Sequence, residues 1–479
     1  MVNKIKRYFR KPEIEFNKPL TSADIVRMFK EKQFNGLKKL MPQFNWGGKR
    51  LSRSKSALVI LGFVLGIGLF STTGNPLPLL LSALSIAYGS LYSFDSGATD
   101  YISVSALDSS HFVVAYRDGA DAKGYARIGT ISSVNEIAYG SVYVFASATT
   151  ATDQFVATLD STHFVIVYRL GATGTAIIGT VSSVDEIAYG SAYQFVSAVI
   201  AHLSVSVLDA THFIAVYKDY SDANYYGTAI IGVVSSVNHI AYGNVAVFNS
   251  ASTFYNSVSA LDSSHFVVAY RDGADFKGYA RIGTVSSGDE IAYGSVYVFN
   301  SAVTADISVS ALDSSHFVVA YRDDGGSDYG GVKIGTIASV NQISYGSEYI
   351  FNSAYTNKIS VSSLDSSHFV VGYKDEGGTD YGCAKIGTIS SVNQVAYGSE
   401  YPFNSVTSDS ISVSALDATH FVVGYRNASD LGSYAVIGTY TPPAAGPANV
   451  KSFNGVAIAD IKSINGVAIA DIKSINSVE

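Results

Sequence analysis

The residues with the clearest chemical potential are seven histidines that follow an Asp turn at regular spacing. Each His belongs to a Leu-Asp-x-x-His-Phe motif, and the motifs begin at Leu107, Leu159, Leu208, Leu261, Leu312, Leu364 and Leu416. A His beside a carboxylate is found in zinc sites and catalytic triads. The motifs recur every 51 residues or so, which opposes both readings, because zinc ligands converge to about 2 Å from one ion. The motif therefore predicts a turn in which Asp and Ser side chains bond their own backbone.

A basic residue stands six positions after each of these histidines. The seven are Arg117, Arg169, Lys218, Arg271, Arg322, Lys374 and Arg426. Asp follows the basic residue in five units, whereas Leu170 and Asn427 replace it in the other two. This pattern favours ion pairs between units or braces of the following loops. The alternative is a ring of cations and acids around a pore or on the upper face.

Candidate ligand-binding residues lie in or beside the Gly- and Asp-rich loops, which vary most between units. They are Asp118, Tyr220, Tyr225, Tyr226, Phe254, Tyr255, Asp323, Asp328, Asp375 and Asp380. Aromatic rings beside acids and amides suit stacking on sugars, although packing between long loops is the alternative. Calcium favours such oxygen donors. The EF-hand spacing is missing and turns use Asp and Gly, so the sequence predicts no cofactor, with calcium as the alternative.

Motifs of established catalytic chemistry are absent from the sequence. There is no nucleophile elbow, phosphate loop or zinc motif, and Cys383 falls in a predicted strand as a buried structural thiol. The units are nearly alike, which favours scaffold or binding work. We therefore expect that the protein is not an enzyme. A glycosidase or lyase is the alternative, and it would need a carboxylate pair roughly 5–10 Å apart.

Four strands are predicted in each unit to position these residues. In the fifth unit they are Ile307–Leu312, His316–Arg322, Gly331–Ile337 and Gln342–Phe351. Val, Ile, Tyr and Phe are frequent in all four strands, and Gly, Asp and Ser cluster between them. The second strand is apolar on both faces, as a sheet packed between two other sheets requires.

The two ends of the repeated region complement each other. The fourth-strand pattern Ile-Ala-Tyr-Gly-Ser-x-Tyr-x-Phe also occurs at Ile86–Phe94, before the first complete unit. The seventh unit ends after its third strand, at Ala435–Thr439. We expect these ends to pair and close a ring, since an open solenoid would need distinct caps instead.

The tandem units resemble a seven-bladed β-propeller repeat protein of surface or envelope type, over residues 84–443. The resemblance implies an all-β fold of four-stranded antiparallel blades, closed by an N-terminal outer strand. It also implies that two sets of loops share one face, which is commonly the binding face. These loops join the second strand to the third and the fourth strand to the next first.

The N-terminal region predicts a membrane anchor. Residues 1–56 carry 15 Lys or Arg and 4 Asp or Glu, a net charge of +11, which leaves −18 for the rest of the chain. They also contain an amphipathic helix pattern. Ala57–Thr73 has no charge over 17 residues, at the short end for a membrane helix, and 57–83 is expected to be transmembrane or interfacial. The positive-inside rule places 1–56 in the cytoplasm and the repeats outside. A buried helix in an assembly is the alternative, and the long basic segment disfavours a cleaved signal peptide.

A second repeat occupies the linker and C-terminal region, residues 444–479. Lys-Ser-Phe-Asn-Gly at Lys451 returns as Lys-Ser-Ile-Asn-Gly at Lys462 and as Lys-Ser-Ile-Asn at Lys473. Asn-Gly between apolar residues predicts β-hairpins. The segment resembles short repeats of phage structural and bacterial envelope proteins. So small a strand set is marginal alone, and residues 451–479 are therefore expected to pair with a second copy of the chain, with the repeated unit at 84–443 or with a partner.

Together these patterns predict a membrane-anchored, extracellular or periplasmic binding module for a protein or glycan. Nucleic acid is not an expected partner, because the repeats are anionic and nucleic-acid binding depends on cations. The alternative is a structural fibre component of a virion or envelope.

Overall fold

A computed structural model describes residues 85–441, except 133–134, 149–150, 183–184, 222–223, 236–237, 339–340, 379 and 391–392. It also describes six two-residue strands outside that range. The chain divides into two compact units, one covering Ala83–Pro443 and the other Met1–Ser82 with Ala444–Glu479. Each is described by itself.

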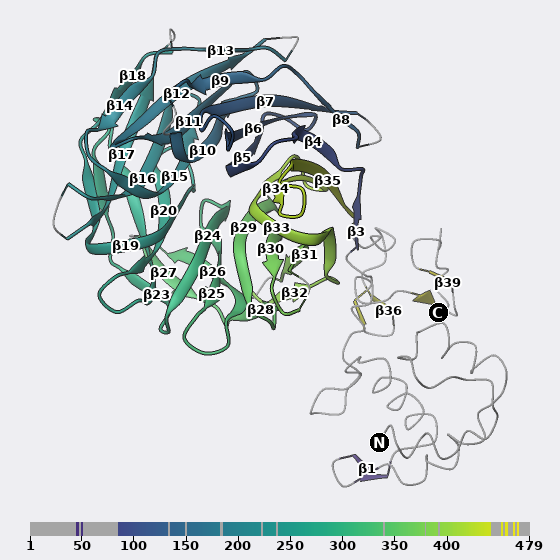
Figure 1. Cartoon of the computed structure of the whole chain (residues 1–479). Coiled ribbons are helices and arrows are strands. Elements are labelled where there is room, and N and C mark those ends of the chain that lie inside the picture. The colour runs from purple at the N-terminus through teal and green to yellow at the C-terminus, as the bar shows by residue number, and fades with distance from the viewer. Residues whose placement is uncertain are drawn as a thin grey trace. The chain divides into compact units, whose positions relative to one another are not determined.

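Ala83–Pro443 is an all-β unit built from repeated antiparallel sheets, arranged around a centre (Figure 1). In each repeat the inner, second and third strands pair in sequence order, and an outer strand in two short segments pairs with the third. The second strands begin at the motif His and contain five or six consecutive buried residues. Both of their faces are therefore covered, as the apolar sequence predicted.

The strands have the following bounds. Inner strands are β5 (Thr99–Ala106), β10 (Ala151–Asp160), β15 (Ile200–Asp209), the second part of β19 (Ala246–Ala260), β24 (Thr304–Asp313), β29 (Thr356–Asp365) and the second part of β33 (Tyr401–Ala415). Second strands are β6 (His111–Asp118), β11 (His163–Leu170), β16 (His212–Asp219), β20 (His265–Asp272), β25 (His316–Asp323), β30 (His368–Asp375) and β34 (His420–Asn427).

Third strands are β7 (Gly124–Ile131), β12 (Thr173–Val181), β17 (Tyr226–Val234), β21 (Gly278–Val285), β26 (Tyr329–Ala338), β31 (Tyr381–Ile389) and β35 (Ser433–Thr441). Outer segments are β8 (Ile137–Tyr139), β9 (Tyr143–Ala146), β13 (Ile187–Tyr189), β14 (Tyr193–Val196), β18 (Ile240–Tyr242), β22 (Ile291–Tyr293), β23 (Tyr297–Asn300), β27 (Gln342–Tyr345), β28 (Tyr349–Asn352), β32 (Val395–Tyr397), β3 (Ser85–Tyr88) and β4 (Tyr92–Asp95). The first parts of β19 and β33 complete the outer strands of their repeats.

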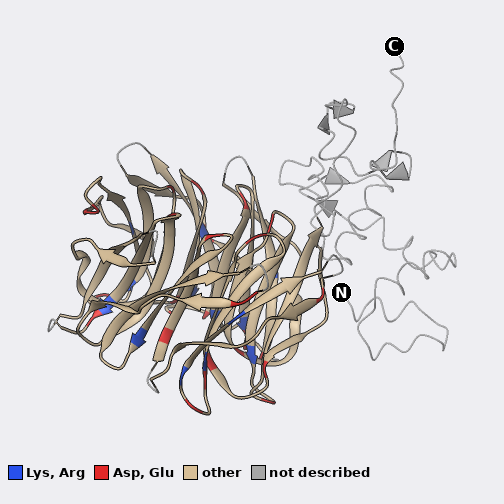
Figure 2. Ribbon diagram, turned by 90° about the horizontal axis from the view of Figure 1, so that it is seen from above, with Lys and Arg blue, Asp and Glu red and all other residues tan. Residues whose placement is uncertain are grey.

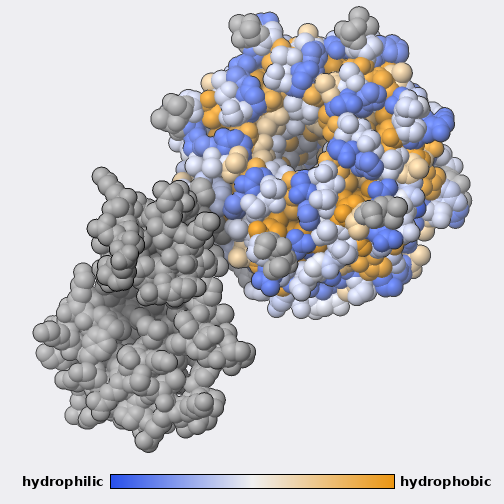
Figure 3. Space-filling view, turned by 180° about the vertical axis from the view of Figure 1, so that it is seen from behind, coloured by the Kyte–Doolittle hydropathy of each residue, from blue (hydrophilic) through white to orange (hydrophobic). Residues whose placement is uncertain are grey.

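The ends of the unit pair with each other. β3 and β4 both pair with β35, with Ile86 opposite Tyr440 and Tyr92 opposite Ala435. The predicted pairing of the N-terminal outer strand with the last repeat is thus confirmed. The inner strands of successive repeats lie side by side, and β33 lies beside β5. The arrangement is consistent with a β-propeller, and Figure 3 shows a hollow at its centre.

Apolar cores lie between successive sheets. One cluster combines Val113 and Ile128 of the first repeat with Phe164 and Tyr168 of the second, and all four are buried. A corresponding cluster joins the last repeat to the first through Val422, Phe94 and Tyr116. Burial of each such side chain stabilises the fold by about 1.5–3 kcal/mol. Figure 2 shows how few charged residues the sheets carry.

Serines of the inner strands join one repeat to the next. Ser412 Oγ accepts a hydrogen bond from the Val104 N–H at 3.1 Å, and Ser414 Oγ accepts one from the Ala106 N–H at 3.0 Å. Ser103 and Ser204 make the same kind of contact with Val156 and Val258. The inner strands therefore lie in matching register, and corresponding residues fall at the same end of the ring.

One prediction about the strands is corrected by the structure, and the predicted helices lie outside the described residues. The fourth strand predicted at Gln342–Phe351 is not continuous: it is divided into β27 and β28 at Gly346–Glu348, where the pairing with β26 also shifts register. The predicted membrane helix at 57–73 and the amphipathic helix in 1–56 lie outside the described residues. Within the part of the chain that the structure describes, no helix has the length and apolar composition to cross a membrane.

The other unit contributes only short strand pairs to the described residues. β1 (Asn45–Trp46) pairs with β2 (Lys49–Arg50). β36 (Ser452–Phe453) pairs with β37 (Val456–Ala457), and β38 (Ser463–Ile464) pairs with β39 (Val467–Ala468). The last two pairs flank the two Asn-Gly dipeptides, in agreement with the predicted hairpins.

Candidate functional site at the bulge end of the ring

Every inner strand contains a bulge at the same position, close to its start. The bulge residue has a φ between 47° and 53°, although none is Gly. We call these residues the bulge row: Tyr101, Asp153, His202, Tyr255, Asp306, Lys358 and Ser410. A positive φ at non-Gly residues costs energy and persists only where the surrounding structure holds it. Bulges re-aim side chains and are frequent at functional sites, so we call this end of the ring the bulge end.

The seven basic residues noted in the sequence lie beside the bulge row. Arg117 pairs in register with Asp100, which directly precedes the bulge at Tyr101, and the other six basic residues occupy the same place in their repeats. We call Arg117, Arg169, Lys218, Arg271, Arg322, Lys374 and Arg426 the cation row. The two rows bring variable side chains and fixed positive charges together at one end of the ring.

Five members of the cation row are neutralised by carboxylates. Arg117 lies 3.5 Å from Asp100, Arg169 lies 3.6 Å from Asp153, and Lys374 lies 2.7 Å from Glu376. Arg322 lies 3.1 Å from Asp306 and 2.8 Å from Asp324. Arg426 lies 2.7 Å from Asp100 and 3.0 Å from Asp409. The contact from Arg426 to Asp100 joins the last repeat to the first, so both predicted roles, a link between units and a loop brace, are present.

Lys218 and Arg271, in the neighbouring third and fourth repeats, differ from the other five. No carboxylate of the described residues lies within ion-pair distance of either cation. Aromatic rings contact them instead. Lys218 Nζ lies 3.8 Å from the ring centre of Phe254, and the Arg271 guanidinium lies 4.6 Å from the same ring. Phe254 is thus shared by two cations, an arrangement in which the ring face stabilises positive charge.

Further rings surround these two cations. Tyr220 and Tyr225 lie 5.1 and 5.3 Å from Lys218 Nζ, and Tyr255 and Phe276 lie 4.9 and 5.5 Å from the Arg271 guanidinium. Lys218 is only 3% exposed, whereas Tyr220, Tyr225 and Phe276 are 39–45% exposed. We call Lys218, Arg271, His202 and these five rings (Phe254, Tyr255, Tyr220, Tyr225 and Phe276) the cation–aromatic cluster.

His202, the bulge residue of the third repeat, lies within this cluster. Its ring centre is 5.4 Å from that of Phe254 and 5.6 Å from that of Tyr255. Burial, and then repulsion from Lys218 and Arg271, lower the pKa of His202 to about 4. The same burial, with repulsion from Arg271, lowers the pKa of Lys218. His202 is therefore neutral near pH 7, and the positive charge of the cluster resides on the lysine and the arginine.

Polar atoms at this boundary lack partners among the described residues. Both side-chain atoms of Asn256, and Nε of Arg271, are buried without a hydrogen bond. Asn256 is 6% exposed and stands where five other repeats have Ile or Leu. Buried polar atoms are normally paired, so the boundary between the third and fourth repeats retains unused hydrogen-bonding capacity.

The structure brings together four of the aromatic residues predicted from the sequence, namely Tyr220, Tyr225, Phe254 and Tyr255. Tyr226 lies at the start of β17, where its hydroxyl accepts a hydrogen bond from Asn224 Nδ2 at 3.1 Å. His202, Phe276 and Asn256 were missed by the sequence reasoning. The signal for two of them was available: His202 and Asn256 each stand alone in residue type at their position among the repeats.

The predicted aspartates belong to other repeats, where they lie at the ends of second strands or in the loops that follow them. Asp118 Oδ1 accepts a hydrogen bond from the Ala120 N–H at 2.6 Å, and Asp375 Oδ1 accepts one from Asn352 Nδ2 at 3.0 Å. Asp323 Oδ1 accepts one from Asn300 Nδ2 at 3.3 Å. Asp328 and Asp380 have a φ of 56° and 54°. Burial, and then its contact with Asp324, raise the pKa of Asp328.

No three His, Cys, Asp or Glu side chains are grouped to hold a metal ion anywhere in the described residues. Cys383 is buried in β31, as predicted, and burial raises the pKa of its thiol.

The Asp-His motifs lie at the opposite end of the ring. Asp108 Oδ1 accepts hydrogen bonds from the Ser110 N–H at 2.7 Å and from the Ser110 hydroxyl at 2.9 Å, and His111 Nδ1 lies 3.0 Å from both carboxylate oxygens. Burial opposes ionisation of Asp108, but these hydrogen bonds outweigh it and lower the pKa of the carboxyl. The predicted turn is confirmed, because the Asp108 side chain accepts a hydrogen bond from the Ser110 backbone. Ser110 and Asp108 both contact Nδ1 of His111, so the His does not link them in the order of a catalytic triad.

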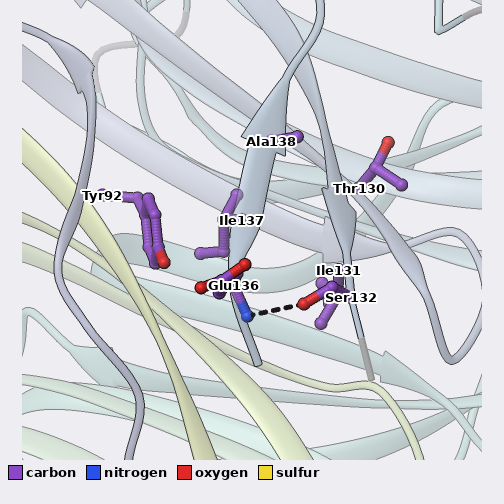
Figure 4. Close-up of a pocket in the computed structure, with 7 residues that line it drawn as sticks. All are labelled: Tyr92, Thr130, Ile131, Ser132, Glu136, Ile137 and Ala138. Carbon is purple, nitrogen blue, oxygen red and sulfur yellow. Dashed lines mark hydrogen bonds between the residues drawn. The ribbon is translucent and has the colours of Figure 1, made fainter. Parts of the chain in front are cut away.

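Two shallow pockets also lie at this opposite end. The larger, of about 390 Å³, is lined by Tyr92 of β4 and by residues 130–132 and 136–138 (Figure 4). Two of these residues are joined by a hydrogen bond, which the Glu136 N–H donates to Ser132 Oγ at 3.1 Å (Figure 4). The second, of about 270 Å³, lies beside Asp313 and His316. Neither pocket is lined by a Lys or Arg side chain.

No family model and no curated protein matches the chain. Solved structures resemble it at 10% sequence identity. A prolyl endopeptidase matches with a TM-score of 0.45, over 71% of this chain and 47% of the endopeptidase chain. This chain therefore spans about half the length of that protein. Hsv2 of Kluyvelomyces marxianus has a TM-score of 0.41 over 68% and 90% of the two chains. The Hadza microbial sialidase Hz136 has 0.40 over 68% and 76%.

One prediction is corrected by these comparisons. The expectation that the protein is not an enzyme was wrong as an exclusion, since a prolyl endopeptidase and a sialidase are among the similar structures. The expectation rested on the near identity of the repeats. That identity describes the framework, whereas the loops and the bulge row vary from repeat to repeat.

Proposed function

We propose that the protein is a seven-bladed β-propeller that binds a protein or glycan ligand at the bulge end of its ring. One observation carries this proposal: the pattern of ion pairs in the cation row is broken at two neighbouring repeats. Lys218 and Arg271 keep the cations of the repeat but have no carboxylate among the described residues. Burying charge is costly unless it is paired, and a purely structural repeat has no reason to lose the partner.

The exposed rings support the same end of the ring as the binding surface. Tyr220, Tyr225 and Phe276 are large apolar side chains held at the rim of the cluster, and each is more than a third exposed. Grouped exposed aromatics with a few polar atoms are typical of ligand sites. The opposite end repeats one Asp-His turn and offers no such departure.

A capture experiment with the full chain tests this function. Immobilised protein is exposed to a glycan array and to extracts, and then compared with a Phe276→Ser, Tyr220→Ser variant. We expect the ligand to be retained by the wild-type chain and lost by the variant. Equal capture by both proteins, with both folded by circular dichroism, would contradict binding at the bulge end.

We propose further that residues 57–73 anchor the protein in a membrane, with 1–56 in the cytoplasm and the propeller outside. The charge asymmetry of the sequence supports this topology. Protease added outside intact cells should digest the ring and leave residues 1–56 protected. Digestion of 1–56 in intact cells would contradict the orientation.

A structural role in a surface fibre is the second candidate, and the repeated strand pairs β36–β37 and β38–β39 favour it. If these pairs drive assembly, deletion of 448–479 should convert oligomers to monomers in light scattering while the ring stays folded. An unchanged mass after the deletion would rule this role out.

A further inference from the structure

We propose that Lys218 and Arg271 bind the carboxylate of an acidic sugar, whose ring stacks on the tyrosines of the cation–aromatic cluster. This inference rests on the proposed binding function and names the chemical class of its ligand. Lys218 and Arg271 both contact the Phe254 ring, at 3.8 and 4.6 Å from its centre. One small anion beside that ring is within reach of both cations.

The charge of the cluster calls for an anion. The other five members of the cation row each have a carboxylate at 2.7–3.6 Å. His202, the histidine of the cluster, is neutral near pH 7 because burial and the two cations lower its pKa. A bound carboxylate would supply to the third and fourth repeats the partner that the other repeats carry themselves.

The rings and the unpartnered amide specify more than a bare anion. Tyr220 and Tyr225 have ring centres 4.9 Å apart and are both exposed, so they present a joined aromatic surface at the rim. Aromatic side chains with a polar tip suit ligands that are apolar on one face and wet on the other, as sugars are. The unpartnered atoms of Asn256 and Arg271 Nε add donors and an acceptor at the same boundary.

Nucleic acid fits the cluster poorly. Binding to a phosphate backbone requires many neutralised phosphates, whereas the described residues leave two cations of the row without carboxylates. An acidic peptide would satisfy the two cations but would not use a stacking surface. Inorganic phosphate and poly-glutamate therefore represent these two ligand classes in the test.

Access to Lys218 requires a movement of the two tyrosines. Lys218 is 3% exposed, and the rings of Phe254, Tyr220 and Tyr225 lie 3.8, 5.1 and 5.3 Å from its ammonium group. Exposed side chains change rotamer on the picosecond to nanosecond scale. We infer that the Tyr220 and Tyr225 rings move away from Lys218 and stack on the sugar when the carboxylate binds. The ammonium group then contacts the carboxylate instead of these two rings.

The test is calorimetry on the full chain with four probes: an oligosaccharide of glucuronic acid, its methyl ester, inorganic phosphate and poly-glutamate. We expect the acid to bind, and the ester to bind at least tenfold more weakly. Arg271→Gln and Lys218→Met should each weaken binding of the acid by at least tenfold. Arg117→Gln, which removes a member of the cation row already paired with Asp100, is the matched control and should bind like the wild type.

Other results would overturn the inference. Equal binding of acid and ester, an effect of Arg117→Gln as large as that of Arg271→Gln, or preference for phosphate or poly-glutamate would each contradict an acidic-sugar site. Capture of a neutral glycan or a protein that Arg271→Gln leaves intact would overturn the inference and keep the proposed function. The melting temperature of each variant is compared with that of Arg117→Gln. This control excludes unfolding as the cause of lost binding.

Discussion

At the scale of single residues, the bulge end combines groups that are costly to bury with unusual backbone conformations. His202 has a positive φ, its imidazole contacts the rings of Phe254 and Tyr255, and burial with repulsion from two cations lowers its pKa. Neither the positive φ nor the buried imidazole stabilises the closed ring of sheets. Such positions are retained where a function uses them and the rest of the fold can absorb the cost.

The lowered pKa of His202 predicts that the free energy of unfolding depends on pH. Its folded pKa is about 4 and its unfolded pKa is about 6.5, so between these values the unfolded chain binds a proton that the folded chain does not. Stability should therefore fall as the pH is lowered from about 6.5 to about 4, by up to about 3 kcal/mol. Lys218 and Arg271 face the imidazole and cause part of the shift.

Urea unfolding of the wild type and of His202→Gln at several pH values measures this contribution. The difference in unfolding free energy between the two proteins should shrink or reverse across the stated range. Parallel curves from pH 4 to 7 would show that His202 titrates normally.

At the scale of elements, aromatic residues lie over glycines of neighbouring strands. Gly335 of β26 is opposite Phe317 of β25, and a Cβ at Gly335 would overlap the Phe317 ring. The same pairing of a motif Phe with a third-strand Gly recurs in the other repeats. It accounts for the abundance of both residue types in the sequence.

Gly335→Ala should destabilise the ring by about 1–3 kcal/mol, because an added methyl group in a packed core forces its neighbours apart. Gly288→Ala is the control, since the nearest atom to a Cβ there is Ser286 Oγ at 4.0 Å. Thermal unfolding should separate the two variants. Similar melting temperatures would show that the Phe317 ring moves aside without cost.

The element scale also shows what the sequence could predict. The Asp turns and the continuous apolar runs that follow them located the second strands, because those signals are local. The bulges were not predictable, since their positive-φ residues include Tyr101, Asp153 and Lys358, and none is the Gly that usually marks such a conformation. The sequence predicts a continuous outer strand because the interruption at Gly346–Glu348 leaves the apolar pattern intact.

At the scale of the whole molecule, closure of the ring depends on its first strands. β3 and β4 supply the outer strand of the last repeat, with Ile86 and Phe94 buried. Sequence reasoning predicted this closure because one surplus strand and one missing strand are visible in the repeat itself. It did not predict the cation–aromatic cluster, whose members come from two repeats and meet only through tertiary packing.

Deletion of residues 1–95 should therefore destabilise the ring more than deletion of residues 1–83. Losing two buried side chains costs about 3–6 kcal/mol, and the edge of β35 is left unpaired. Calorimetric melting of both truncated proteins measures the difference. Equal stability would show that β3 and β4 contribute little to closure.

Hydrogen exchange of the full chain, with and without its captured ligand, tests the central claim most directly. If the bulge end is the binding surface, protection on binding will be confined to residues 200–204 and 253–257 and to the loops that carry Tyr220 and Phe276. Protection centred on the Asp-His turns, such as residues 108–111, would place the ligand at the opposite end and contradict the account.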